Sequence, residues 1–271
     1  MNGQFDIIIV GDSKSGNTIV KSLAAAAASI KIAFISREFK RTTTRDFINV
    51  EYVTGNVAFT DYKNRLFGCY LSTGERLYCT HLIVATGLRY EPLTVNSKTI
   101  IDVFNTADNI DKQAKIQQAI VVGGSDAAAK LALAAAKKYR YVYLCTKTMD
   151  ICATDSTVKK LNDAHNIVVL PNSSITKVYM TKGVITSVEL DSYSSLTCSA
   201  IFAKTPAVPD VDFVSAKLFA KDDEGFLKTT KYLESVLVPK CFAAGNCVKK
   251  STKKMVLALI DNVLKDFIGG I

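Results

Sequence analysis

Glycine-rich turns are the features of this sequence whose residue types and spacing could support chemistry. One of them, Gly123-Gly124-Ser125, lies between the apolar run Ala119–Val122 and an alanine-rich stretch. The run predicts a buried strand, and the stretch predicts a helix. Glycines at such a junction let a pyrophosphate approach the backbone, and the first N–H groups of the helix favour an anion. The turn therefore predicts a nucleotide site, and a packing turn without a ligand is the alternative.

A related turn, GDSKSG, stands at residues 11–16 after the first apolar run of the chain. Ser13 occupies the place where a dinucleotide-binding turn usually has the glycine that a pyrophosphate approaches. Its Cβ narrows the room for that group. The next expected strand ends at Ser36, where a carboxylate would normally bind a ribose. Gly11, Ser13 and Gly16 are therefore candidate residues of a weakened dinucleotide site.

The elements that must position these turns follow from the hydrophobic pattern. Each turn belongs to a strand–helix–strand unit, and the two turns lie about 110 residues apart. Paired apolar runs at 51–71 and 174–191 predict β-hairpins, and Ser251–Phe267 predicts an amphipathic final helix. We expect an α/β fold with two Rossmann-like, three-layer lobes, each with an added β-hairpin or meander layer. The second lobe is inserted into the first, because the final turn and helix need a sheet to complete.

The composition indicates an intracellular globular protein with enough apolar residues for two modest cores. Of the 271 residues, 48% are hydrophobic, and no run of 18 apolar residues predicts a membrane span. No signal peptide is recognisable, so we expect a cytoplasmic protein without a membrane partner. Seven cysteines form no C-x-x-C pair, and the chain has two histidines. We therefore expect reduced, buried thiols and no metal site.

The net charge of +9 permits contact with an acidic partner but does not require one. The basic residues concentrate at Arg37–Arg45, Lys137–Arg140 and Lys249–Lys254. Solvated surface is the ordinary role of such stretches. If Arg37–Arg45 and Lys249–Lys254 converge, an acidic protein or a ribonucleoprotein becomes a candidate partner. No interleaved aromatic residues indicate base stacking.

The order of motifs resembles the thioredoxin-reductase branch of the two-dinucleotide-binding-domain flavoproteins. After the N-terminal glycine loop, the matching stretches are LIVATG (82–87), VVGGSDAA (121–128), GFLKTTKYLES (225–235) and CFAAGNCV (241–248), so the resemblance spans essentially the whole chain. It implies an FAD lobe at 1–103 plus 229–271, an NAD(P)H lobe at 104–228, and a homodimer. It also adds Thr86, Gly87, Gly245 and Asn246 to the candidate cofactor-binding residues.

The sequence departs from that family at the positions that would carry the chemistry. Residues 103–113 contain no cysteine where the family has its C-x-x-C pair, so disulfide exchange lacks a nucleophile. Only about fifteen residues precede the hairpins, too few for the family's Gly-Gly-Gln flavin cradle. Asn246 replaces an Asp that contacts the flavin, and Lys254 replaces a Gln. Cys145–Thr148 keeps a single lysine where several cations would bind the NADP 2′-phosphate.

These departures leave two hypotheses, one for a binding protein and one for an enzyme. In the first, which we favour, the chain is a pseudoenzyme that keeps the fold and binds a protein, a ribonucleoprotein or a nucleotide. In the second, it is an NAD(P)H-dependent FAD oxidoreductase that passes electrons to a small acceptor without a dithiol. Thioredoxin-disulfide reductase activity is not expected in either. Neither hypothesis assigns a catalytic residue or a metal ligand.

Overall fold

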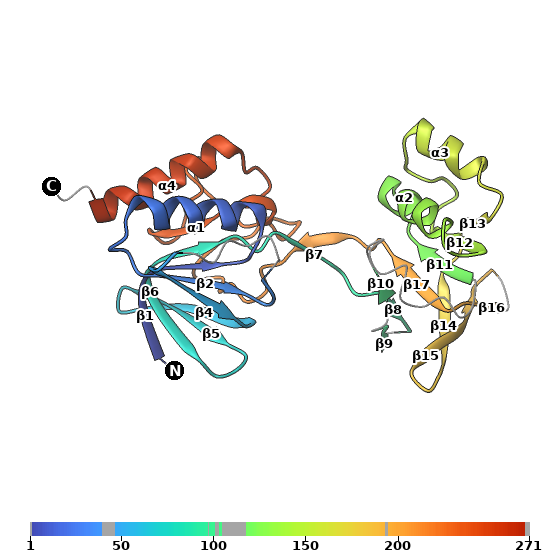
Figure 1. Ribbon diagram of the computed structural model, residues 1–271, viewed down its shortest axis with the longest axis horizontal. Coiled ribbons are helices and arrows are strands. Elements are labelled where there is room, and N and C mark those ends of the chain that lie inside the picture. The colour runs from blue at the N-terminus through green and yellow to red at the C-terminus, as the bar shows by residue number, and fades with distance from the viewer. Residues whose placement is uncertain are drawn as a thin grey trace. The chain divides into compact units, whose positions relative to one another are not determined.

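The computed structural model describes residues 2–39, 47–96, 98–100, 103–104, 118–192 and 195–268. The chain forms two compact units, coloured by residue number in Figure 1. Unit 1 comprises Met1–Arg89 and Val208–Ile271, and unit 2 comprises Tyr90–Ala207. The second unit is therefore inserted into the first, as the sequence predicts. The chain passes between the units near β7 (Leu88–Tyr90) and β18 (Ala207–Pro209).

The unit boundaries differ from those expected at residues 103/104 and 228/229. Residues 208–228 belong to unit 1, although the sequence assigned them to the second lobe. The reason is hydrophobic packing, because Phe213, Leu218 and Leu227 are buried in the same core as the first strands of the chain. Their positions could not be read from local patterns, since this segment forms no long helix or strand.

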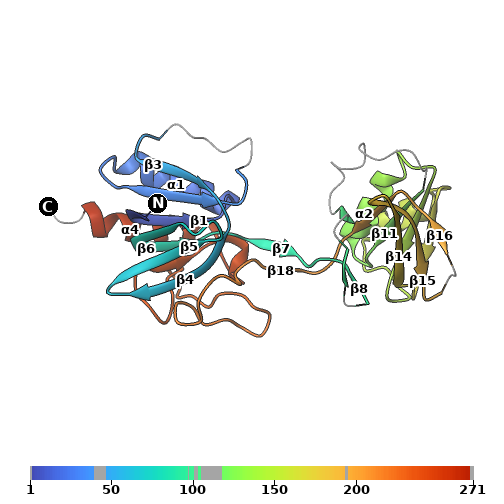
Figure 2. The ribbon, with the colours of Figure 1, turned by 90° about the horizontal axis from the view of Figure 1, so that it is seen from below.

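Within the described residues, unit 1 is built on a seven-stranded sheet in the order β3-β2-β1-β6-β5-β4, with β19 also paired to β6. The strands β1, β2, β3, β6 and β19 are parallel, and β4 and β5 extend the sheet in antiparallel fashion, as Figure 2 shows. Their bounds are Asn2–Val10 (β1), Ile32–Ser36 (β2), Val50–Thr54 (β3), Val57–Lys63 (β4), Leu66–Leu71 (β5), Arg76–Val84 (β6) and Cys241–Ala243 (β19).

Two helices of unit 1, α1 (Lys14–Ala26) and α4 (Lys253–Ile268), lie side by side on one face of this sheet (Figure 1). Each helix buries one apolar stripe, which is what a period of 3.6 residues predicts. The stripe of α1 includes Ile19 and Leu23, and that of α4 includes Val256 and Val263. A short 3₁₀ turn, η2 (Gly245–Cys247), precedes α4.

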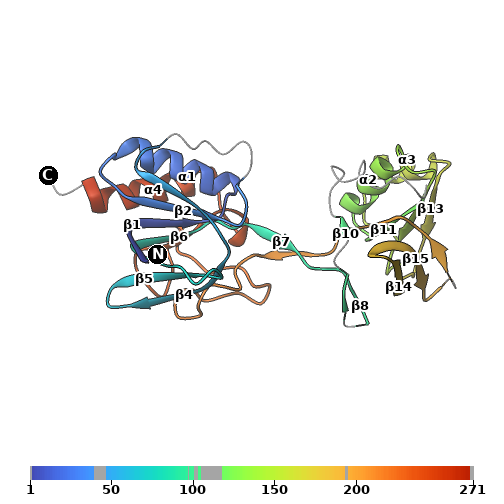
Figure 3. The same ribbon diagram turned by 60° about the horizontal axis from the view of Figure 1, so that its bottom comes forward.

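Unit 2 has a parallel sheet of five strands within the described residues, in the order β10-β17-β11-β12-β13. Helices α2 and α3 cover one face and the meander β14-β15-β16 covers the other, as Figure 3 shows. The bounds are Thr94–Val95 (β8), Lys98–Thr99 (β9), Val103–Phe104 (β10), Gln118–Val122 (β11), Asp126–Ala135 (α2), Tyr141–Cys145 (β12), Asp155–Asn162 (α3), Ile167–Leu170 (β13), Ile175–Thr181 (β14), Val184–Leu190 (β15), Leu196–Thr197 (β16) and Ala200–Ala203 (β17).

The fold class expected from the sequence is confirmed, because each unit is built on a Rossmann-like parallel sheet with added antiparallel strands. In unit 2 these strands form a separate layer, and in unit 1 they extend the same sheet. Most of the basic stretch 37–45, and the segment 105–113 where a C-x-x-C pair would lie, fall outside the described residues. In the part of the chain that is described, no helix has the length and apolar character that a membrane crossing needs.

A partly buried hydrogen bond links the final helix to the sheet of unit 1. His81 on β6 is 2% exposed, and its Nε2 lies 2.9 Å from Oδ2 of Asp266 on α4. Lys240 Nζ lies 3.1 Å from the same carboxylate, and the Phe267 ring centroid lies 4.7 Å from that of the imidazole. Burial lowers the pKa of His81, and the hydrogen bond to Asp266 opposes this effect without cancelling it.

We predict that the free energy of unfolding decreases as the pH falls below about 6.5, the usual histidine pKa, because the unfolded chain then binds a proton that folded His81 resists. The contribution of His81 to stability is fully present above about pH 6.5, and it is lost as the pH falls towards the lower pKa that His81 has in the folded protein. Urea unfolding between about pH 7.5 and about pH 5.5 measures this slope. His81→Gln should flatten it. Equal slopes in the wild type and His81→Gln would contradict the prediction.

Candidate functional site

The two glycine turns have the same backbone form and differ at their central position. Gly11 and Gly123 each follow a strand end and have φ values of +112° and +139°. Two residues later, Ser13 and Ser125 each cap the following helix, α1 or α2. The residue between them is Asp12 in unit 1 and Gly124 in unit 2. The chain therefore contains a matched pair of turns, one with a central carboxylate and one without.

Contacts within the protein account for Gly11, Gly16 and Gly245 of unit 1. A Cβ on Gly11 would lie 2.5 Å from the Cα of Thr86, and a Cβ on Gly16 would lie 2.1 Å from the Gly11 carbonyl oxygen. A Cβ on Gly245 would lie 2.9 Å from Ser15 Oγ. The structure thus brings the turn after β1, the end of β6 and η2 together at the carboxyl edge of the sheet. Candidate residues far apart in the sequence meet there.

Asp12 places a buried carboxylate at the N-terminus of α1. Its side chain is 7% exposed, and Asn17 Nδ2 donates a hydrogen bond to its Oδ1. A negative charge at this end of a helix is stabilised by the helix dipole. Ser13 Oγ accepts the N–H of Gly16 at 3.1 Å, so that donor is also engaged. A pyrophosphate at this turn would meet an internal carboxylate of the same sign of charge.

The neighbouring strand ends of unit 1 are joined through Asp210. Thr86 donates its hydroxyl to the Asp210 carbonyl at 2.7 Å, and the Asp210 N–H donates to the Gly87 carbonyl at 3.0 Å. Arg37, which follows β2, lies 2.9 Å from the Asp210 carboxylate. Ser36, at the end of β2, supplies no carboxylate for a ribose, and the guanidinium of the next residue is paired within the protein. With the acid at the first turn, these residues do not fit an FAD.

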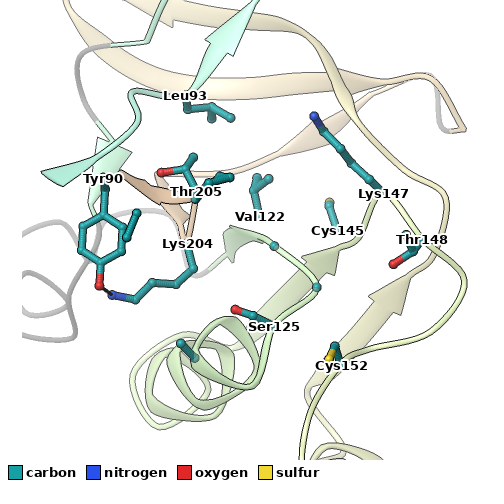
Figure 4. Close-up of a pocket in the computed structure, with 15 residues that line it drawn as sticks. Tyr90, Leu93, Val122, Ser125, Cys145, Lys147, Thr148, Cys152, Lys204 and Thr205 are labelled. Atoms are coloured by element: carbon teal, nitrogen blue, oxygen red, sulfur yellow. Dashed lines mark hydrogen bonds between the residues drawn. The ribbon is translucent and has the colours of Figure 1, made fainter. Parts of the chain in front are cut away.

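Unit 2 has an open pocket above its glycine turn, with a volume of about 640 Å³ (Figure 4). This size lies within the range of small-molecule sites. The lining comes from the carboxyl ends of β11, β12 and β17, from the start of α2 and from the segment 90–93. The lining residues are Tyr90, Leu93, Val122, Gly123, Gly124, Ser125, Ala127, Cys145, Lys147, Thr148, Cys152, Lys204, Thr205, Pro206 and Ala207.

The charges of this pocket favour an anion. Lys147 and Lys204 are its two cationic residues, and none of the described residues that line it is Asp or Glu. Asp126, in the first turn of α2, does not line the pocket. It forms an ion pair with Lys130 at 2.6 Å and accepts the N–H of Thr154 at 3.3 Å. Lys130 is the main cause that lowers the pKa of Asp126 to about 2, so this carboxylate is ionised but engaged elsewhere.

The two glycines of this turn have different roles. A Cβ on Gly123 would lie 3.0 Å from the Lys204 carbonyl oxygen, so Gly123 is required for packing. A Cβ on Gly124 would meet nothing closer than Thr148 Oγ1 at 3.5 Å. The pocket side of the turn is therefore open at Gly124. Gly123, Gly124 and Ser125, which the sequence singles out together, all line this one pocket.

Sequence reasoning missed Lys204 and Tyr90. Lys204 Nζ lies 3.4 Å from the Tyr90 hydroxyl and 4.5 Å from the centroid of its ring. Lys204 follows β17, which pairs with β11 directly beside the glycine turn. The position of Lys204 after a strand could have identified it, because residues at the carboxyl ends of adjacent parallel strands lie at the same edge of the sheet. Using it requires the strand order, which the sequence alone did not supply.

The thiols are not arranged for disulfide exchange. All seven cysteines lie in the described part of the chain; six are buried, as expected, and Cys152 is exposed, which corrects the expectation for that residue. Burial raises the pKa of Cys145 and Cys198 to about 12 and that of Cys247 to about 11. Such thiols are protonated at neutral pH and are poor nucleophiles. Among the described residues, no group of His, Cys, Asp or Glu could hold a metal ion.

The remaining candidate residues lie on the surface of unit 1. Asn246 is exposed on η2, and Lys249 forms an ion pair with Glu224. Lys253 and Lys254 are exposed at the start of α4. Convergence of the basic stretches stays a prediction, because most of residues 37–45 fall outside the described part of the chain.

We predict that the fold tolerates alanine at position 124 but not at position 16. Gly16→Ala should destabilise the fold by about 1–3 kcal/mol or more, since its Cβ would overlap the Gly11 carbonyl. Gly124→Ala should change stability by no more than about 0.5 kcal/mol, because its Cβ makes only ordinary contacts. Urea unfolding of both variants measures the difference. A Gly16→Ala protein as stable as the wild type would contradict the packing described for unit 1.

Comparison with known proteins extends over nearly the whole chain. The family described as pyridine nucleotide-disulphide oxidoreductase matches residues 7–262. Among curated proteins, a thioredoxin reductase from Chlamydia pneumoniae is 24% identical over 198 residues, which are 69% of this chain and 63% of that protein. The match therefore spans less than two thirds of that relative's length.

Solved structures of thioredoxin reductases share the fold. The enzyme of Lactococcus lactis has a TM-score of 0.73 at 16% identity, covering 98% of this chain and 99% of that chain. The enzyme of T. acidophilum has a TM-score of 0.74 at 13% identity, covering 96% and 99%. At such identities the likeness shows the fold alone, which is the two-lobed fold of thioredoxin-reductase-like FAD/NAD(P) oxidoreductases.

Proposed function

We propose that this chain, which belongs to the pyridine nucleotide-disulphide oxidoreductase family, is a fold-retaining nucleotide-binding protein and not a disulfide reductase. Nucleotide binding is assigned to unit 2. Unit 1 supports the fold and holds no flavin. The proposed function is therefore the binding of a nucleotide by one unit of a fold that usually binds two dinucleotides.

The observation that carries this proposal is the pocket above Gly123-Gly124-Ser125. It combines an open glycine turn, the N-terminus of α2, two lysines and an apolar wall, with no lining carboxylate among the described residues. Helix N–H groups and lysine ammonium groups both bind phosphate oxygens. Apolar residues such as Leu93 and Val122 offer surface to a base or a ribose. In a nucleotide complex, Gly124 would lie nearest the phosphates.

The matched turn of unit 1 supports the other half of the proposal. Asp12 supplies an internal anion at the helix N-terminus where an FAD pyrophosphate would be held. Two negative groups a few ångströms apart in a partly buried site repel each other strongly. The ribose carboxylate is also missing, and Arg37 is bound to Asp210 in that region. The residues of unit 1 therefore support a structural role for this turn and no step of a flavin-dependent reaction.

Disulfide reduction, which the names of the related proteins indicate for them, would need a reactive dithiol. The sequence has no C-x-x-C pair, and six of the seven thiols are buried. Exposed Cys152 lacks a neighbouring cysteine at that spacing. The alternative function, an NAD(P)H-dependent flavin oxidoreductase without a dithiol, would not need this pair. It would need a bound flavin, and the buried carboxylate of Asp12 and the pairing of Arg37 with Asp210 do not favour flavin binding.

We predict that the purified chain binds adenine nucleotides and that Gly124→Asp weakens binding by about tenfold or more, since it places a carboxylate beside the phosphates. Gly124→Ala is the matched comparison and should weaken binding clearly less than Gly124→Asp, because its Cβ fits the protein and adds no charge. Titration calorimetry with ADP, ATP, NAD⁺ and NADP⁺ measures these affinities. Failure of all four to bind, or equal weakening in both variants, would overturn the proposed function.

A further inference from the structure

We propose that the unit 2 pocket selects a nucleoside polyphosphate over a dinucleotide, and that Lys204 is the residue that makes this selection. The inference rests on the proposed nucleotide binding and adds the class of nucleotide.

Lys204 and Lys147 stand on opposite sides of the glycine turn. Lys204 follows β17 and Lys147 follows β12, and both strands pair with β11, whose end leads into Gly123. Neighbouring strands lie about 4.8 Å apart, so the two lysine backbones are about 10 Å apart with the turn between them. Figure 4 shows Lys204 on one side of the turn, lying along Tyr90, and Lys147 on the other side.

Lys204 is held in the wall of the pocket without being neutralised. Its Nζ lies 4.5 Å from the Tyr90 ring centroid and 3.4 Å from the Tyr90 hydroxyl. A cation–π contact orients an ammonium group but leaves its charge in place. Among the described carboxylates, none forms an ion pair with Lys204 or Lys147. The backbone of Lys204 also packs on Gly123, which fixes the start of its side chain beside the turn.

The lining of the pocket therefore has positive groups from three places: the N-terminus of α2, Lys147 and Lys204. A nucleoside di- or triphosphate carries its negative charges in one continuous chain of phosphates, which can contact the helix N-terminus and extend to a lysine. NAD⁺ carries its negative charges only in the central pyrophosphate, with a neutral adenosine at one end and a cationic nicotinamide riboside at the other. NADP⁺ adds one phosphate at one end, which would satisfy one of the two lysines. The charge distribution of the pocket matches the polyphosphate best.

Titration calorimetry of the full chain with ATP, ADP, NAD⁺ and NADP⁺ tests the inference. We expect ATP and ADP to bind about tenfold tighter than NAD⁺ or NADP⁺. Lys204→Met should lower the ATP affinity about tenfold, the loss expected for one charge-assisted hydrogen bond, and should leave the NAD⁺ affinity within about twofold. Lys204→Arg should keep the preference for ATP. Lys159→Met, on α3 and away from the pocket lining, is the control and should change neither affinity.

Two results would overturn the inference while the proposed function stands. One is tighter binding of NAD⁺ or NADP⁺ than of ATP. The other is equal weakening of all four nucleotides by Lys204→Met, which would show a structural role for the lysine. If Lys204→Met does not fold, the comparison of Lys204→Gln with Lys204→Arg replaces it. Failure of the wild-type chain to bind any of the four would overturn the inference and the proposed function together.

Discussion

The contact between a glycine turn and the end of a neighbouring strand is the constraint on which both units depend. In unit 1 the Gly11 backbone lies where a Cβ would overlap Thr86, and in unit 2 Gly123 lies against the Lys204 carbonyl. Each contact fixes the start of a helix above its sheet and so directs the free N–H groups of that helix. The contact is a requirement of packing and does not depend on a ligand. This explains how the family fold is retained while the residues around the turns have changed.

The two turns show how one local structure can serve different electrostatic arrangements. In unit 1 the helix N-terminus is complemented by the protein's own Asp12, and in unit 2 the same place is an open glycine between two lysines. A single side chain at the centre of the turn thus decides whether the helix N-terminus has an internal carboxylate beside it. The buried thiols fit this account, because neither unit offers the accessible pair of cysteines that disulfide exchange needs.

The sequence predicted the features that depend on local spacing. The strand–turn–helix units follow from motifs, and the structure contains them; Gly245, which only the family resemblance added, lies beside the first turn. It could not predict the burial of Asp12 or the position of Lys204, because both depend on which strands are neighbours. The unit boundary was misplaced for a related reason. Residues 208–228 lack a periodic pattern, and they join unit 1 through tertiary contacts of scattered side chains such as Phe213.

The visible absorption spectrum of the purified chain, recorded after incubation with excess FAD and removal of free flavin, tests the central claim most directly. The account predicts no flavin absorbance, because Asp12 puts a negative charge where FAD would need a phosphate donor and Ser36 supplies no carboxylate for the ribose. Stoichiometric bound FAD, bleached on addition of NADH or NADPH, would contradict the account and would identify the chain as a flavin-dependent oxidoreductase.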